Sequence, residues 1–122
     1  MNNDLSIEQI NDTVTSKAAE LSTKLNLPVI GLCFKHVDQW IVGYVKKPNR
    51  MTVRQAIDRM EKFGKLDAGD LILQTCLIRE ESDSRIVDMN PEYDGINNGA
   101  CLEVLSLVEI SLSVIKKNTT NI

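Results

Sequence analysis

Apolar residues recur along two short runs, 29–35 and 40–46, which together predict an antiparallel β-hairpin. Both runs are rich in the β-branched and aromatic residues that suit a pleated sheet. The segment between them is short enough for a tight turn, although it lacks the Asn-Gly or Asp-Gly pair typical of such turns. Both faces of the second run are largely apolar. We therefore expect one face to meet helices and the other to meet a further layer or a partner.

A helix is predicted before the hairpin, over residues 7–25. Its apolar residues recur at steps of three and four: Ile7, Ile10, Val14, Ala18, Leu21 and Leu25. Ser6 and Gln9 have the spacing of a capping box at its start, and Pro28 ends it. The apolar stripe is narrow, so this helix either packs against the hairpin of its own chain or pairs with another copy.

A second helix is predicted after Pro48. Thr52 and Gln55 have capping-box spacing, which predicts a helix that starts at Thr52. Gly64 stands where a left-handed C-cap is needed, so the helix should end there. The residues on its predicted buried stripe are Val53, Ala56, Ile57, Met60 and Phe63.

A third helix is predicted almost immediately after Gly64. Asp67 is its expected N-cap, and Leu66 and Leu71 have the spacing of a hydrophobic staple. The residues of its predicted buried face are Leu71, Ile72, Thr75 and Cys76, with Leu73 and Leu77 to the side.

The segment 99–115 is apolar almost all round, which is typical of a helix buried in a core. Its β-branched residues keep a strand open as an alternative for the second half. Two glutamates interrupt the apolar run, so it is not expected to span a membrane.

The segment 80–98 is polar and acidic, and we expect a loop there. Within it, Asn90 before Pro91 is predicted to cap one helical turn through Tyr93. Residues 1–4 and 116–122 are expected to be flexible tails. The predicted fold class is α+β. It consists of an N-terminal helix, an antiparallel β-hairpin and then three or so helices, packed as a single domain over residues 1–122.

Charge is unevenly distributed along the chain, although the formal net charge is only −3. Seven basic residues against two acidic ones give +5 over residues 46–65, and eight acidic residues against two basic ones give −6 over residues 67–94. Such segregation can bind a phosphate backbone, join copies head to tail, or cancel within one fold. Intramolecular cancellation or a solvated face is the simplest expectation.

The three cysteines, Cys33, Cys76 and Cys101, each stand inside an apolar pattern. We expect them to be buried free thiols, because free cysteine is among the most buried residue types. The first residues do not form a basic-then-apolar signal segment, and no transmembrane run is present. These patterns favour a protein of the cytosol or of the interior of a virion.

The pattern offers little for catalysis. His36 is the only histidine, and its place at the expected hairpin turn favours an exposed structural residue, with Cys33 on the opposite face of the strand. Residues 88–94 loosely match a calcium-binding loop. However, Tyr93 stands where glycine makes the sharp turn, and Gly99 where glutamate closes the loop. The sequence therefore predicts a non-enzyme, without cofactor or metal.

The order of segments resembles a known group of proteins. The hairpin run that begins at Trp40 and ends in the basic-proline step at Pro48, the helical segments 52–57 and 68–76 and the apolar segment 102–110 are similar to small tailed-bacteriophage proteins of the tail-assembly chaperone kind. The likeness covers about positions 29–115, and the helix over 7–25 departs from the short chaperones.

The resemblance implies a non-enzymatic bacteriophage assembly or virion protein. Such a protein acts by contacting other phage structural proteins or itself, in the host cytoplasm or the virion, with no membrane. Trp40 and Tyr44 are the expected anchors of these contacts, because aromatic residues are enriched at binding hot spots, although core packing is an equal alternative for both.

The alternative hypothesis is a small module that binds nucleic acid or another anionic partner. The basic residues expected to bind it are Lys46, Lys47, Arg50, Arg54 and Arg59. Nucleic acid is the less favoured partner, because single strands bind where aromatic residues stand among the basic ones. The only aromatic residue in segment 46–65 is Phe63, which the helix pattern places inward.

Overall fold

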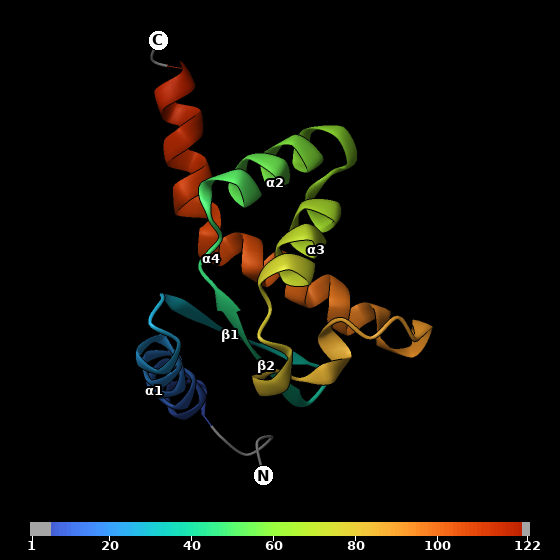
Figure 1. Cartoon of the computed structure of the whole chain (residues 1–122). Coiled ribbons are helices and arrows are strands. Elements are labelled where there is room, and N and C mark those ends of the chain that lie inside the picture. Colours follow the sequence, from blue (N-terminus) through green and yellow to red (C-terminus); the bar gives the residue numbers. More distant parts are fainter. Residues whose placement is uncertain (1–5, 121–122) are drawn as a thin grey trace.

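The computed structural model describes the backbone of residues 6–120 and the side chains of residues 6–108. Its elements are α1 (Ile7–Leu25), β1 (Val29–His36), β2 (Gln39–Lys46), α2 (Arg50–Phe63), α3 (Lys65–Cys76), the short 3-10 helices η2 (Arg79–Glu81), η3 (Ser84–Ile86) and η4 (Pro91–Tyr93), and α4 (Asp94–Thr120). This is the predicted α+β arrangement of a helix, a hairpin and further helices (Figure 1). The predicted tail residues 1–4 and 121–122 lie outside the described residues, whereas residues 116–120 belong to α4.

The hairpin pairs β1 with β2 in antiparallel register, with Val29 opposite Lys46 at its open end. Only Val37 and Asp38 form the turn, and Val37 adopts a positive φ of 57°. Two-residue turns with positive φ angles match the right-handed twist of paired strands. The turn therefore closes the hairpin without the Asn-Gly pair that usually marks it.

The outer edge of β2 is covered by the chain that follows α3. The Ile78 N–H donates to the Tyr44 carbonyl oxygen at 2.8 Å, and the Asp83 N–H donates to the Val42 carbonyl oxygen at 2.9 Å. These bonds satisfy backbone groups that would otherwise form an open sheet edge. They also hold the start of the polar segment against the hairpin.

Helices cover both faces of the hairpin (Figure 1). On one face α1 completes a group that we call the α1 cluster, whose buried members are Ile10, Val14, Ala18, Leu21, Tyr44 and Ile78. On the other face α2, α3 and α4 enclose the main core, whose most buried large side chains include Leu32, Ile41, Val45, Ile72, Leu73 and Ile86. Of the two alternatives for the first helix, packing on its own hairpin is the one observed.

The ends of α1 follow from its sequence. The Ser6 hydroxyl accepts from the Gln9 N–H at 3.2 Å and the Gln9 side chain accepts from the Ser6 N–H at 2.9 Å, so the predicted capping box is confirmed. Asn26 ends the helix in the left-handed conformation, with φ 55°. Gly31 lets α1 lie close to β1, because a Cβ there would stand 2.3 Å from the Val14 side chain.

Two predicted helix starts are wrong. Asn49, not Thr52, caps α2, and its side-chain oxygen accepts from the Thr52 N–H at 2.8 Å. Asparagine is at least as good a cap and comes earlier, so Thr52 turns inward and is buried. Asp67 does not cap α3, because Gly64 alone joins the two helices. Gly64 has a positive φ of 100°, but its ψ of −179° is not the left-handed C-cap conformation that was predicted, and α3 begins at the next residue.

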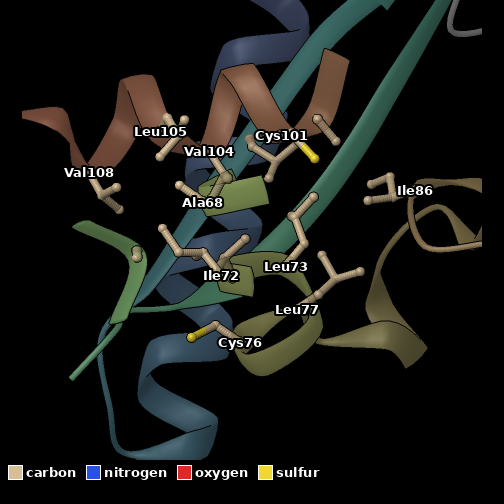
Figure 2. Packing of buried hydrophobic residues seen from close by; sticks show 14 of the residues in the cluster. Ala68, Ile72, Leu73, Cys76, Leu77, Ile86, Cys101, Val104, Leu105 and Val108 are labelled. Atoms are coloured by element: carbon tan, nitrogen blue, oxygen red, sulfur yellow. The ribbon is translucent and has the colours of Figure 1, made fainter. Parts of the chain in front are cut away.

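The buried face of α3 differs from the predicted one. Ile72 and Cys76 are buried as expected, but Thr75 is exposed and Leu71 is only partly buried. The buried positions are Ala68, Gly69, Ile72, Leu73 and Cys76. Figure 2 shows Ala68 and Ile72 on the side of α3 toward Val104 and Leu105 of α4, and Cys76 at the end of α3 away from α4. The face is rotated because α4 approaches α3 at Gly69, where a Cβ would lie 2.4 Å from the Cys101 carbonyl oxygen.

The predicted inward position of Phe63 is also wrong, since its side chain is 68% exposed. Phe63 is the last residue of α2, and the chain turns into α3 directly after Gly64. The end of the helix therefore lies beyond the reach of the main core, although the helical stripe continues to it.

The segment 80–98 is more ordered than a loop. It contains η2, η3, η4 and the start of α4, which begins at Asp94 rather than at Gly99. Asn90 caps the turn through Tyr93 as predicted, because its side-chain oxygen accepts from the Glu92 N–H at 3.0 Å. The strand alternative for the second half of 99–115 is wrong, since α4 is helical throughout.

We expect Gly69→Ala to lower the free energy of unfolding by about 1–3 kcal/mol, because the added methyl group would push the backbone of α4 away from α3. Gly95→Ala is the matched control. There the methyl would meet only the His36 ring at the hairpin turn, which can move, and alanine favours a helix by about 0.5–1 kcal/mol. Denaturant titration measures both, and equal stability of the two variants would contradict the prediction.

Candidate functional site

Basic residues gather where β2 passes into α2. Lys46 ends β2, Lys47 follows it, Arg50 begins α2 and Arg54 lies one turn further along. We call these four residues the basic corner. All four are exposed, while Pro48 between them is buried and fixes the bend of the chain.

The basic corner lies at a helix end that already carries partial positive charge. The first turn of α2 contains no acidic residue, so nothing there offsets the helix dipole. Arg50 opposes that dipole, and an unfavourable charge in the first turn typically costs about 0.3–1 kcal/mol. The basic corner therefore concentrates positive charge at this end of α2.

No ion pair within the described side chains neutralises the basic corner. The ion pairs among these side chains join Lys17 to Glu81, Lys62 to Asp58 and Arg85 to Asp83. None of them connects the basic segment 46–65 to the acidic segment 67–94. We expected the opposite charges of these two segments either to cancel within one molecule or to face solvent. Among the described side chains, no ion pairs between the two segments are observed.

The segment between α3 and α4 forms an acidic surface. The exposed carboxylates that we include under this name are Glu80, Asp88, Glu92 and Asp94. Asp83 differs, because hydrogen bonds from the Arg85 side chain hold the pKa of its carboxyl below the usual value. Arg85 also donates to the Gln39 side chain at 2.8 Å, which links the acidic segment to the hairpin turn.

The two predicted aromatic anchors lie on the α1 side of the hairpin. Tyr44 is only 5% exposed and packs in the α1 cluster, so it is not available as a surface anchor, contrary to the prediction. Trp40 is half-buried against the same cluster, with the Lys35 ammonium 5.7 Å from its ring centre. A role of Trp40 in binding stays a prediction.

Exposed apolar side chains that the sequence pattern did not predict lie at the turn between α2 and α3. Phe63 is 68% exposed and Leu66 is 42% exposed, on either side of Gly64. We call these two side chains the α2–α3 tip. No described atom lies within 4 Å of where a Cβ of Gly64 would be, apart from the neighbouring residues, so the position between the two side chains is open. The sequence contains one signal for this surface. Gly64 predicts a tight turn, and apolar residues directly before and after such a turn lie at the helix ends, where less of the core reaches them.

A hollow of about 260 Å³ lies beside the acidic surface. It is lined by Leu77, Arg79, Asp83, Ser84, Val87 and Asp88. Arg79 is held to one side by a hydrogen bond from its guanidinium to the Gln74 side chain at 2.9 Å. Ser84 is the only hydroxyl group among the lining residues, and no histidine lies beside it to act as a base. The lining therefore offers apolar walls and charged groups, but no activated nucleophile.

The thiols are not arranged as nucleophiles. Burial raises the pKa of the Cys33 and Cys76 thiols, and burial together with Asp70 and Asp67 raises the pKa of Cys101 to about 12. A reactive cysteine needs a lowered pKa. Among the described residues, no group of histidine, cysteine and carboxylate side chains is placed to hold a metal ion.

Comparison with known proteins adds no assignment. No protein-family model, no curated protein and no solved structure matches this chain. Within residues 6–120, none of the helices combines the length and the apolar character that crossing a bilayer requires. The candidate sites are the three surfaces described above: the basic corner, the acidic surface and the α2–α3 tip.

We expect the three thiols to react with iodoacetamide at about pH 8 in the order Cys33, Cys76, Cys101, because thiolate is the reactive form and Cys101 has the highest pKa and is 1% exposed. Mass spectrometry of peptides sampled over time measures the rates. All three should react alike in denaturant. Faster labelling of Cys101 than of Cys33 in the folded protein would contradict the order.

Proposed function

We propose that this protein is a non-catalytic assembly protein that works by binding another protein through the α2–α3 tip. The observation that carries the proposal is the exposure of Phe63 and Leu66 together at one turn. Because the Phe63 side chain is exposed, it adds little to the stability of the core. Aromatic side chains supply much of the binding energy at protein interfaces, so a partner is a reason for its position.

The position of the tip supports a binding role. Phe63 is the last residue of a 14-residue helix, and Leu66 is the second residue of the next one, so regular backbone holds both side chains. The connection between the helices is Gly64 alone, which limits its freedom. Binding therefore needs little ordering of the chain, and little entropy is lost when a partner covers the two side chains.

Charged residues surround the tip. Lys62 and Lys65 flank it and both are exposed, although Lys62 is paired with Asp58 at 3.1 Å. An apolar centre with a polar rim is the usual composition of a protein interface. Glu61 and Asp67 are exposed beside the tip as well, so the partner surface that fits is an apolar pocket with charges of both signs at its edge.

The resemblance to small tailed-phage proteins supports a more specific form of this proposal. In that form the partner is a structural protein of a phage particle or a second copy of this chain, and the site of action is the host cytoplasm or the virion. The basis is the order of elements, in which a hairpin ends in the basic-proline step at Pro48 and short helices and an apolar helix follow.

We expect Phe63→Ser to weaken partner capture by at least about 30-fold, the loss of roughly 2 kcal/mol typical of a hot spot. The immobilised protein is exposed to a nuclease-treated extract of the cells that make it, and retained proteins are quantified by mass spectrometry. Ile7→Ser is the matched control, because Ile7 is 63% exposed on α1, far from the tip in the chain. Neither substitution removes a buried side chain.

Two results would contradict the proposal. One is a set of captured proteins that Phe63→Ser leaves unchanged, and the other is the absence of any protein retained above the background of the bare support. If the protein lost with Phe63→Ser is a metabolic enzyme and not a component of a particle, protein binding is supported and the phage assignment is abandoned.

The alternative function is binding of nucleic acid through the basic corner. The observation that favours it is the exposure of four basic side chains without an ion pair around the start of α2. For this function, affinity for a short DNA duplex must fall steeply with added salt and be lost in the double variant Lys47→Glu, Arg50→Glu. Fluorescence anisotropy at low salt measures it, and unchanged binding by that variant would exclude it.

A further inference from the structure

The basic corner and the acidic surface cannot satisfy each other within one molecule. No ion pair among the described side chains joins the two segments. In Figure 1 the start of α2 and the turns that lead into α4 lie on different sides of the protein. Each chain therefore carries two oppositely charged surfaces that both lack a partner within it.

We propose that copies of this chain associate head to tail, with the basic corner of one copy on the acidic surface of the next. The inference rests on the proposed function to the extent that the protein acts through protein contacts. It adds a second surface, distinct from the α2–α3 tip, and names the partner as a second copy.

The charges of the two segments are well matched. The basic segment 46–65 carries a net +5 and the acidic segment 67–94 a net −6. Of these charges, the basic corner supplies four positive ones and the acidic surface four negative ones, so two copies in contact can neutralise these two surfaces. Complementary surfaces of this kind speed association and exclude partners of the wrong charge.

Each surface also carries an exposed methionine. Met51 is 62% exposed between Arg50 and the next turn of α2, and Met89 is 87% exposed beside Asp88. Methionine is flexible and fills irregular contacts well. These side chains offer apolar area to bury at the centre of a contact that is otherwise made by charges.

The hollow beside the acidic surface suits a long basic side chain. Leu77 and Val87 can pack along the aliphatic part of an arginine or lysine, and Asp88 can meet its charged end. Asp83 is already paired with Arg85 at 2.8 Å, so Asp88 is the carboxylate of the hollow without an ion pair. The Arg79 guanidinium donates to the Gln74 side chain at the wall of the hollow. Its positive charge repels the charged end of the entering arginine or lysine, which favours the side of Asp88.

The contact joins two different surfaces and so is heterologous. A heterologous contact leaves one free surface of each kind at the ends, and the assembly either continues as a chain or closes into a ring. A nucleic acid on the basic corner would instead leave the acidic surface unpartnered and would be repelled by it. The second copy is therefore the partner that accounts for both surfaces.

The test is the mass of the full chain in solution, measured by light scattering at raised protein concentration. In about 20 mM salt the wild type should exceed the monomer mass, and in about 500 mM salt it should return to the monomer, because salt screens exposed charges. Association that persists unchanged in high salt would overturn the proposal.

Two double variants make the test specific. Arg50→Glu with Arg54→Glu changes the summed charge of the basic corner from +4 to 0, and Asp88→Lys with Glu92→Lys changes that of the acidic surface from −4 to 0. Each variant alone should remain a monomer in low salt. A mixture of the two should associate in equal proportion, because each then offers the charge that the other lacks.

The controls are Lys24→Glu and Glu20→Lys on the exposed side of α1, which change charge in each direction away from both surfaces. They should associate like the wild type. Melting curves check that the variants are folded, which matters for Asp88 because it accepts a hydrogen bond from the Asn90 N–H at 2.8 Å.

The proposal is overturned if the wild type stays a monomer in low salt, if the mixture does not associate, or if the monomer binds a DNA duplex through the basic corner instead. Each of these outcomes leaves the proposed contact at the α2–α3 tip intact. That contact is measured by capture of other proteins and by Phe63→Ser.

Discussion

The close approach of α3 and α4 at Gly69 is the contact on which the rest of the structure depends. A side chain at this position would collide with the backbone of α4 at Cys101, so the two helices lie in contact only because glycine stands there. Their contact fixes which side of α3 is buried (Figure 2) and carries α4 across the hairpin. Nearer the start of α4, a Cβ at Gly95 or Gly99 would collide with the ring of His36 or Phe34, so α4 also lies close to β1.

The hairpin separates two apolar clusters that are built differently. The main core gathers side chains from the hairpin, from α2, α3 and α4, and from Ile86 in the turns between them. The α1 cluster depends on one helix and on a short stretch of hairpin and following chain. Both faces of β2 are therefore buried, and its outer edge is closed by the chain after α3. The surfaces left for binding are consequently the helix ends and the acidic turns.

The surface electrostatics follow from this arrangement. The basic corner lies at the end of the hairpin where the chain enters α2, and the acidic turns follow α3 and lead into α4. Ion pairs form mostly between residues close in sequence, such as Lys62 with Asp58 and Arg85 with Asp83, and these do not bridge the two regions. The separation of charge along the chain is thereby kept as a separation in space.

The sequence by itself determined the elements whose signals are local. The Ser6 and Gln9 capping box, the hairpin, the end of α2 at Gly64 and the turn after Asn90 depend on neighbours within a few residues, and all are observed. Tertiary structure decided what distant partners control. Tyr44 is buried because α1 covers it, and Phe63 is exposed because the core ends before the last turn of α2. The two charged segments form no ion pair with each other among the described side chains because of where the fold places them, and a local sequence pattern does not predict that placement.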